Sequence, residues 1–95
     1  MLYRPFGNTG IETSSLGMGC MRFENPDDID AMAEVVYHAY ERGVNYIDTA
    51  PFYCGDKSED IVGAAVKEMK KGAKPFYLAT KCGSPDGDEV RRSLE

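Results

Sequence analysis

The chain has 95 residues, of which 42% are hydrophobic and 28% are charged, and its formal net charge at pH 7 is −5. This composition is typical of a soluble globular protein, and no apolar run approaches the roughly 18 residues of a membrane helix, which excludes a disordered chain and a membrane-spanning one. The first residues lack the apolar core of a signal peptide, so we expect a cytoplasmic protein. The one compact group of lysines, between residues 67 and 74, lies at a predicted helix end, where cations interact favourably with the helix dipole. We therefore do not expect the protein to bind nucleic acid.

Short strand-like segments open the chain. Residues 3–6 and 11–14 flank the turn-forming sequence Gly7-Asn8-Thr9-Gly10, and this arrangement predicts a β-hairpin. Three further strand-like segments cover residues 16–19, 45–48 and 76–81, and their last residues are 29 and 33 positions apart. A period of about 30 residues is typical of one strand-and-helix unit.

An amphipathic helix is predicted between the first two of these strands. Asn25 can cap it, Pro26 suits its first position, and Gly43 suits its exit. Its apolar stripe consists of Ile29, Met32, Ala33, Val36, Ala39 and Tyr40.

Two more helices are predicted. One covers residues 57–71, with Asp56 as N-cap, Glu59 as its capping-box partner and Gly72 at the exit. Its inward residues are Ile61, Val62, Ala65 and Met69. The other begins at Pro85-Asp86 and is still running near Glu95.

Alternating strands and helices at this spacing predict parallel strands joined by right-handed crossovers, within one α/β domain covering residues 1–95. Gly17-Met18-Gly19 lacks the third glycine and the immediate helix of a dinucleotide fingerprint, so a Rossmann domain is excluded. His38 lies about 180° from the apolar stripe of its helix, and we expect it to be exposed.

Two charged residues lie at the carboxyl ends of neighbouring predicted strands. Asp48 ends the second strand and Lys81 ends the third, and alternation of side chains places both on the same face. Neighbouring strands are about 4.8 Å apart, so the carboxylate and the ammonium can pair. The pair alone is equally compatible with an ordinary ion pair at the edge of a sheet.

Tyr53 gives the pair a chemical use. It follows Asp48 by five residues, and an ammonium beside its hydroxyl would stabilise the phenolate and lower a pKa that is otherwise about 10. The phenol would then be a usable general acid for a carbonyl oxygen.

The three cysteines, Cys20, Cys54 and Cys82, are odd in number and form no C-x-x-C pair, which argues against a disulfide framework, a zinc ribbon or another metal site. Each follows a predicted strand end, so all three would gather at one face. Two interpretations stay open: a thiol-sensitive site, or cysteines that fill small semi-buried spaces.

The combination of Asp48-Thr49-Ala50 with Tyr53, and of Ala79-Thr80-Lys81 after the next strand, resembles the aldo-keto reductase family. The resemblance continues through Ser58-Glu59 and Ile61-Val62-Gly63. It implies that Asp48, Tyr53 and Lys81 occupy three of the family's four catalytic positions. The fourth, a histidine, would fall beyond Glu95.

The resemblance also implies a (β/α)₈ barrel, which typically needs about 250 residues. The chain would then be an incomplete domain that contains the hairpin and about the first three of eight units. By itself it is expected to be inactive. It is also expected to self-associate through its unpaired strand edge. A subgroup of the family with a ferredoxin-like iron–sulfur tail is similar over the opening residues and residues 19–22.

In such a reductase the substrate is a small carbonyl compound and the cofactor is NADPH, with NADH as the alternative. Gly19, Cys20, Met21 and Arg22, together with Asp48, are the implied cofactor contacts; simple loop packing is the other interpretation for residues 19–22. A rival function is a non-catalytic remnant or interaction module derived from the barrel. Fold alone does not distinguish these functions.

Overall fold

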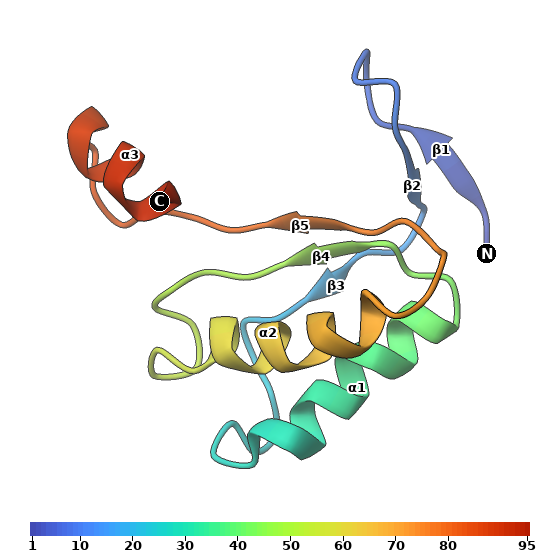
Figure 1. Ribbon diagram of the computed structural model, residues 1–95, viewed down its shortest axis with the longest axis horizontal. Helices are drawn as coiled ribbons and strands as arrows, with labels where there is room; N and C mark the ends of the chain where they lie inside the picture. The colour runs from blue at the N-terminus through green and yellow to red at the C-terminus, as the bar shows by residue number, and fades with distance from the viewer.

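A computed structural model describes all 95 residues as a mixed α/β fold with a hairpin, a parallel sheet and three helices (Figure 1). The hairpin contains β1 (Tyr3–Pro5) and β2 (Glu12–Ser14); the sheet contains β3 (Met18–Gly19), β4 (Tyr46–Asp48) and β5 (Tyr77–Ala79). The helices are α1 (Ile29–Glu41), α2 (Ser58–Met69) and α3 (Gly87–Leu94). Every predicted element is present, and the strands are shorter than predicted.

The three strands of the sheet are parallel and follow chain order, β3-β4-β5. Ile47 pairs with Met18 on one side and with Leu78 on the other. A helix connects each strand to the next, which confirms the predicted strand–helix–strand alternation.

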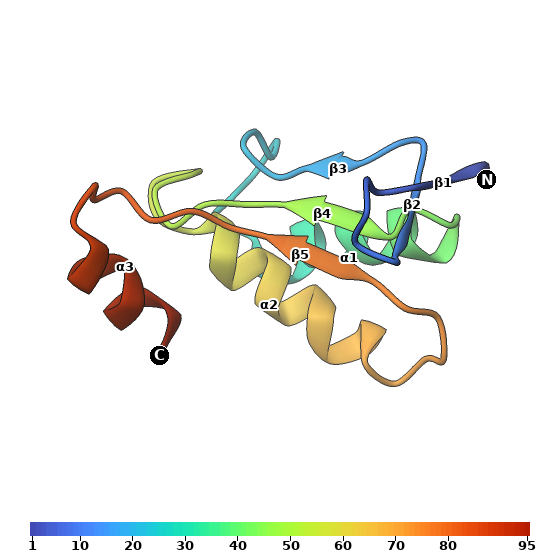
Figure 2. The same cartoon turned by 90° about the horizontal axis from the view of Figure 1, so that it is seen from above.

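Helices α1 and α2 lie side by side against one face of this sheet (Figures 1 and 2). Between the layers lies one core of nine buried side chains: Cys20, Ala33, Val36, Tyr40, Ile47, Ile61, Val62, Ala65 and Met69. The predicted inward residues of α2 all belong to it, and so do Ala33, Val36 and Tyr40 of the predicted stripe on α1. None of the three helices combines the length and the apolar character that crossing a bilayer requires.

The start of α1 differs from the prediction. Asp28 is the N-cap, and its carboxylate accepts a hydrogen bond from the N–H of Ala31 at 3.1 Å. Residues 25–28 instead form a turn closed by the Asp28 N–H and the Asn25 carbonyl, so Asn25 and Pro26 precede the helix. A carboxylate at this position also interacts favourably with the helix dipole. The exit is as predicted, with Gly43 at φ +102° after the last turn.

The predicted cap of α2 is wrong. Cys54, Gly55 and Asp56 all have positive φ values, 56°, 60° and 69°, and this left-handed turn moves Asp56 out of the cap position. Lys57 is the N-cap and makes no side-chain cap bond. Glu59 does not reach back to the helix start, because its carboxylate accepts a hydrogen bond from Thr80.

The second face of the parallel sheet has no helical layer, and α3 lies apart from α1 and α2 (Figure 2). The accessible surface is 6466 Å², against about 5,400 Å² expected for a folded monomer of 10.5 kDa. Leu78 occupies the same sheet face as Ile47 but is 49% exposed, because the two packed helices do not cover it. The fold therefore leaves more surface open than a closed domain of this size.

Candidate active site

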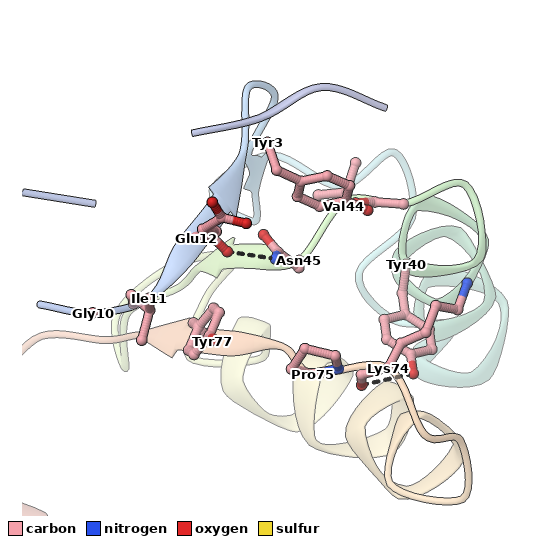
Figure 3. A pocket seen from close by; sticks show the side chains of 11 residues that line it. Tyr3, Gly10, Ile11, Glu12, Tyr40, Val44, Asn45, Lys74, Pro75 and Tyr77 are labelled. Carbon is pink, nitrogen blue, oxygen red and sulfur yellow. Dashed lines mark hydrogen bonds between the residues drawn. The ribbon is translucent and has the colours of Figure 1, made fainter. Parts of the chain in front are cut away.

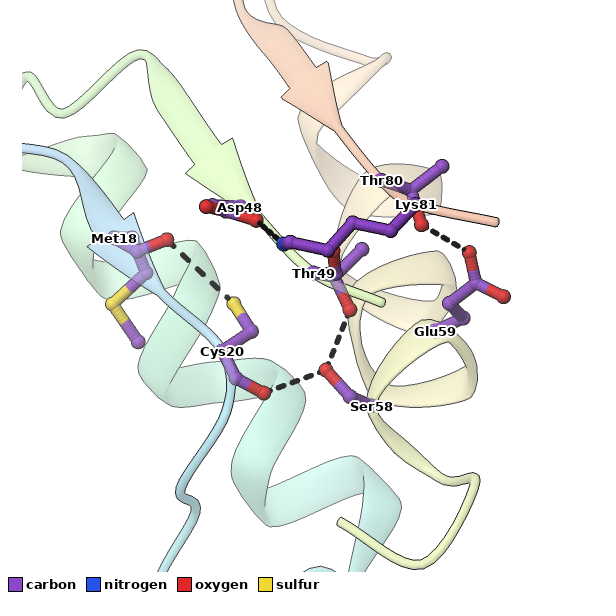
Figure 4. Close-up of polar contacts among 8 residues, drawn as sticks. All are labelled: Met18, Cys20, Asp48, Thr49, Ser58, Glu59, Thr80 and Lys81. Carbon is purple, nitrogen blue, oxygen red and sulfur yellow. Dashed lines mark hydrogen bonds and ion pairs between the residues drawn. The ribbon is translucent and has the colours of Figure 1, made fainter. Parts of the chain in front are cut away.

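Asp48 and Lys81 meet at the carboxyl end of the parallel sheet (Figure 4). Asp48 is the last residue of β4, and Lys81 follows β5 by two residues. The Lys81 Nζ donates hydrogen bonds to Asp48 Oδ1 at 2.5 Å and to the Thr49 carbonyl at 3.0 Å. The pairing predicted from the strand ends is therefore present, and a backbone carbonyl adds a second acceptor.

Tyr53 completes this group from the turn between β4 and α2. The Lys81 Nζ lies 4.8 Å from the centre of the Tyr53 ring, a cation–π arrangement. The ring of Phe52 packs edge-on against Tyr53 at 5.4 Å. The predicted proximity of the Lys81 ammonium to the Tyr53 side chain is therefore present, and a hydrogen-bond interaction with Tyr53 contributes to the raised pKa of Lys81.

The charge on Lys81 is well supported. Its hydrogen bond with Asp48, followed by its interaction with Tyr53, raises the pKa of the Lys81 ammonium above its ordinary value. The side chains of Lys81 and Asp48 are 37% and 46% exposed, so both stay open to solvent and to a ligand. Lys81 is consequently a permanent cation at neutral pH.

The loop after β3 borders the same end of the sheet. Gly19 is exposed, and a Cβ added to it would meet no atom within 4 Å. Met21 and Arg22 are exposed as well. These three residues and Asp48 leave an open surface on which a cofactor can lie.

Cys20, the fourth predicted cofactor contact of this loop, differs from its neighbours because its side chain is buried. Its side chain is fully buried in the core, its N–H donates to the Asp48 carbonyl, and its carbonyl accepts from Ser58. Burial, with the nearby Asp48 and Cys54 as smaller causes, raises the pKa of the Cys20 thiol to about 12. The Cys20 thiol therefore packs in the core as a protonated group.

All three cysteines are free thiols, and Cys54 and Cys82 are half-buried. The Cys54 thiol contacts the same loop, with its Sγ 3.1 Å from the Met21 carbonyl oxygen. No three histidine, cysteine or carboxylate side chains come together as a metal site. Cys54 thus joins the Tyr53 turn to the loop after β3.

Buried polar contacts behind the site were missed by the sequence analysis. Ser58 is fully buried, and its hydroxyl bridges the Thr49 hydroxyl at 2.6 Å and the Cys20 carbonyl at 2.7 Å. Ser58 and Thr49 lie within the motifs that resemble the reductase family, but side chains this small give no signal of burial before the helix is placed. His38, expected to be exposed, is exposed.

A cavity of about 350 Å³ lies at the other end of the sheet, between the hairpin, the end of α1 and the start of β5 (Figure 3). Tyr3, Glu12, Tyr40 and Lys74 are among its lining residues. A second cavity of about 280 Å³ lies beside Lys81 and is lined also by Glu59 and Thr80. Only the second cavity adjoins the catalytic candidates.

Known proteins resemble this chain over most of its length. The model of the aldo/keto reductase family matches residues 15–94. The chain is 34% identical to L-galactose dehydrogenase of Arabidopsis thaliana, over 97% of its own length and 32% of the relative. It is 38% identical to the aldo-keto reductase YhdN of Bacillus subtilis, over 85% of its own length and 25% of the relative. It is 32% identical to versiconal hemiacetal acetate reductase of Aspergillus parasiticus, over 86% and 26%.

The chain spans at most about a third of the length of these relatives, and the names of all three describe oxidoreductases. Its mixed α/β architecture is consistent with the N-terminal portion of such a protein. The family match covers β3 through α3, including the strand ends that carry Asp48 and Lys81. The chain therefore belongs to the aldo/keto reductase family.

Proposed function

We propose that this chain supplies Asp48, Tyr53 and Lys81 of a reductase that converts aldehydes and ketones to alcohols with NADPH. The observation that carries the proposal is the position of the Lys81 ammonium, 2.5 Å from Asp48 Oδ1 and 4.8 Å from the Tyr53 ring centre. Family membership and three oxidoreductase relatives support the same reaction class.

Each residue has a role that follows from its chemistry. Tyr53 is the general acid that donates its hydroxyl proton to the carbonyl oxygen. Lys81 stabilises the phenolate that remains, and Asp48 together with the Thr49 carbonyl holds the Lys81 ammonium in place. A nicotinamide cofactor, when bound, supplies the hydride.

The open loop after β3 is the proposed cofactor surface. Gly19 lets a planar group approach the backbone closely, and Arg22 is an exposed guanidinium that can bind a phosphate or a ribose hydroxyl. Met21 and the second carboxylate oxygen of Asp48 are the other proposed contacts. We propose NADPH as the cofactor, with NADH as the alternative.

We propose further that activity requires a complete (β/α)₈ barrel, of which the hairpin and the three strand–helix units are the opening part. The uncovered face of the sheet and the excess accessible surface support this proposal. The 95-residue chain alone is then expected to be inactive. Three free thiols suit a reducing compartment, and we propose the cytoplasm.

A chimeric enzyme tests the reaction. Residues 1–95 replace the matching segment of the Bacillus subtilis relative, and reduction of an aromatic aldehyde is followed as NADPH oxidation. Tyr53→Phe should lower kcat at least about 100-fold, the usual contribution of a general acid. Tyr37→Phe, a half-buried tyrosine on α1, is the matched control and should leave kcat unchanged.

A folded chimera whose kcat is the same with Tyr53 and with Tyr53→Phe would overturn the assignment of the general acid. The 95-residue chain is assayed beside it. Turnover by that chain alone would contradict the need for a complete barrel and would mean that the three residues suffice, or that several copies assemble a site.

The second candidate function is a non-catalytic remnant or interaction module. The exposed face and edge of the parallel sheet favour it, because such surfaces bind other chains. The coding region after Glu95 discriminates the two. A continuing frame with a histidine after a fourth strand supports the reductase, and a stop codon supports the module.

A further inference from the structure

We propose that Ser58 and Glu59, the first two residues of α2, are positioning residues that fix the carboxyl ends of all three parallel strands around the catalytic group (Figure 4). The inference rests on the proposed function, because the group that they position is the one assigned to proton delivery.

Ser58 joins the first two strand ends. Its hydroxyl donates to the Cys20 carbonyl, which follows β3, at 2.7 Å. A hydroxyl has one proton, and a carbonyl can only accept, so the 2.6 Å contact with Thr49 must run from the Thr49 hydroxyl to the Ser58 oxygen. The hydrogen-bond chain therefore has one direction, from Thr49 through Ser58 to Cys20.

This chain reaches the catalytic group through Thr49. Thr49 follows Asp48 directly, and its own carbonyl accepts a hydrogen bond from the Lys81 Nζ at 3.0 Å. Ser58 and Thr49 are both buried, at 0% and 4% exposure, so water cannot replace a lost partner there. Displacement of Thr49 would move both acceptors of the Lys81 ammonium.

Glu59 holds the third strand end. Its Oε2 accepts a hydrogen bond from the Thr80 hydroxyl at 2.6 Å, and Thr80 immediately precedes Lys81. Two consecutive residues of one helix thus point in different directions, Ser58 toward the ends of β3 and β4 and Glu59 toward the residue after β5 (Figure 4). The helix start sets the spacing between the Asp48 and Lys81 backbones.

The loop after β3 is held by the same Ser58 hydroxyl. Because the Cys20 carbonyl is bound to Ser58, the backbone that leads to Met21 and Arg22 starts from a fixed point. Positioning of the proposed cofactor surface and of the Lys81 ammonium is consequently coupled through one buried hydroxyl.

Competitive lysine labelling of the 95-residue chain tests this inference without any need for turnover. A limiting amine-reactive reagent is added at pH 8, and mass spectrometry measures labelling of Lys81 relative to the exposed, unpaired Lys67 and Lys70. Lys81 should label slowly, because its contacts with Asp48 and Thr49 hold it as an ammonium. Asp48→Asn is the positive control and should remove this protection.

Ser58→Ala should raise Lys81 labelling at least about threefold, because displacement of Thr49 should cost the Lys81 ammonium about one of its hydrogen bonds. Labelling of Lys67 and Lys70 should not change. Ser15→Ala, an exposed serine at the other end of the sheet, is the matched control and should change nothing. Unchanged Lys81 labelling in folded Ser58→Ala would overturn the role of Ser58.

Glu59→Ala and Glu59→Gln provide a second test at an exposed position, where folding is not at risk. Glu59→Gln keeps an oxygen that can accept from Thr80 and should retain slow labelling, whereas Glu59→Ala should raise it. Equal labelling in the two variants would overturn the role of Glu59. Because labelling requires no substrate or cofactor, these results stand apart from the turnover assay of the proposed function.

Discussion

Asn45 and Ser14 bind each other reciprocally. The Ser14 N–H donates to Asn45 Oδ1 at 2.7 Å, and the Asn45 N–H donates to Ser14 Oγ at 3.1 Å. The Asn45 side-chain Nδ2 also donates a hydrogen bond to the Glu12 carbonyl at 3.0 Å. Both residues are buried, and through them the hairpin is fastened to the residue that precedes β4.

Asn45→Ala should therefore detach the hairpin from the sheet. The buried Ser14 N–H loses its acceptor, at a cost of about 1–3 kcal/mol in the free energy of unfolding. Urea denaturation measures this cost, and hydrogen exchange of the Ser14 amide reports the local opening. Asn8→Ala, in the exposed hairpin turn, is the control; equal stability of the two variants would contradict a fastening role for Asn45.

The buried Cys20 thiol makes stability depend on alkaline pH. Its pKa is about 12 in the folded chain, against an ordinary value of 9.0, so the unfolded chain loses this proton first. The contribution of this thiol to the free energy of unfolding is fully present below about pH 9. It is lost as the pH rises from 9 to 12, with a limiting slope of about 1.4 kcal/mol per pH unit. Cys20→Ala should flatten the slope between pH 9 and 10 in urea titrations; an unchanged slope would refute this cause.

Thiol reactivity should separate the three cysteines. Iodoacetamide at pH 8 should alkylate Cys54 and Cys82 in the native chain and leave Cys20 unmodified, because Cys20 is fully buried and stays protonated. Mass spectrometry of native and denatured samples measures the difference. Alkylation of Cys20 at the rate of Cys54 would show that the core opens.

Modification of Cys54 would also break its contact with the Met21 carbonyl, beside the proposed cofactor loop. We therefore expect NADPH binding to the chimera to weaken after alkylation, and Cys54→Ser to remove that sensitivity. Unchanged NADPH affinity with all reactive thiols alkylated would rule out the thiol-sensitive site and leave the packing interpretation.

Self-association is the expected behaviour of the isolated chain. Its accessible surface exceeds the expected value by about 1,000 Å², and β5 has strand β4 on one side only. Sedimentation velocity should show a mass that increases with concentration. Leu78→Lys, which places a charge on this edge strand, should reduce the increase, and Val35→Lys on an exposed surface of α1 is the control. A concentration-independent monomer would contradict the prediction.

Much of the fold could be predicted because it depends on local periodicity. The apolar spacing on α1 and α2 identified core side chains such as Val36 and Ile61, and strand alternation placed Asp48 and Lys81 on one face. Cap positions were less predictable. Asp28 caps α1 in preference to Asn25, and Asp56 fails to cap α2, because backbone turns outside the helices decide which side chain reaches the free N–H groups.

By itself the sequence determined the order of the elements, the core residues on α1 and α2 and the three chemical groups of the candidate site, since these follow from periodicity and from motifs a few residues long. Only the tertiary structure decided how those groups meet. It placed the Lys81 ammonium over the Tyr53 ring, buried the Cys20 side chain in the core and joined Ser58 to two strand ends. Such contacts connect residues far apart in the chain, and their geometry depends on how the strand ends and the start of α2 pack together.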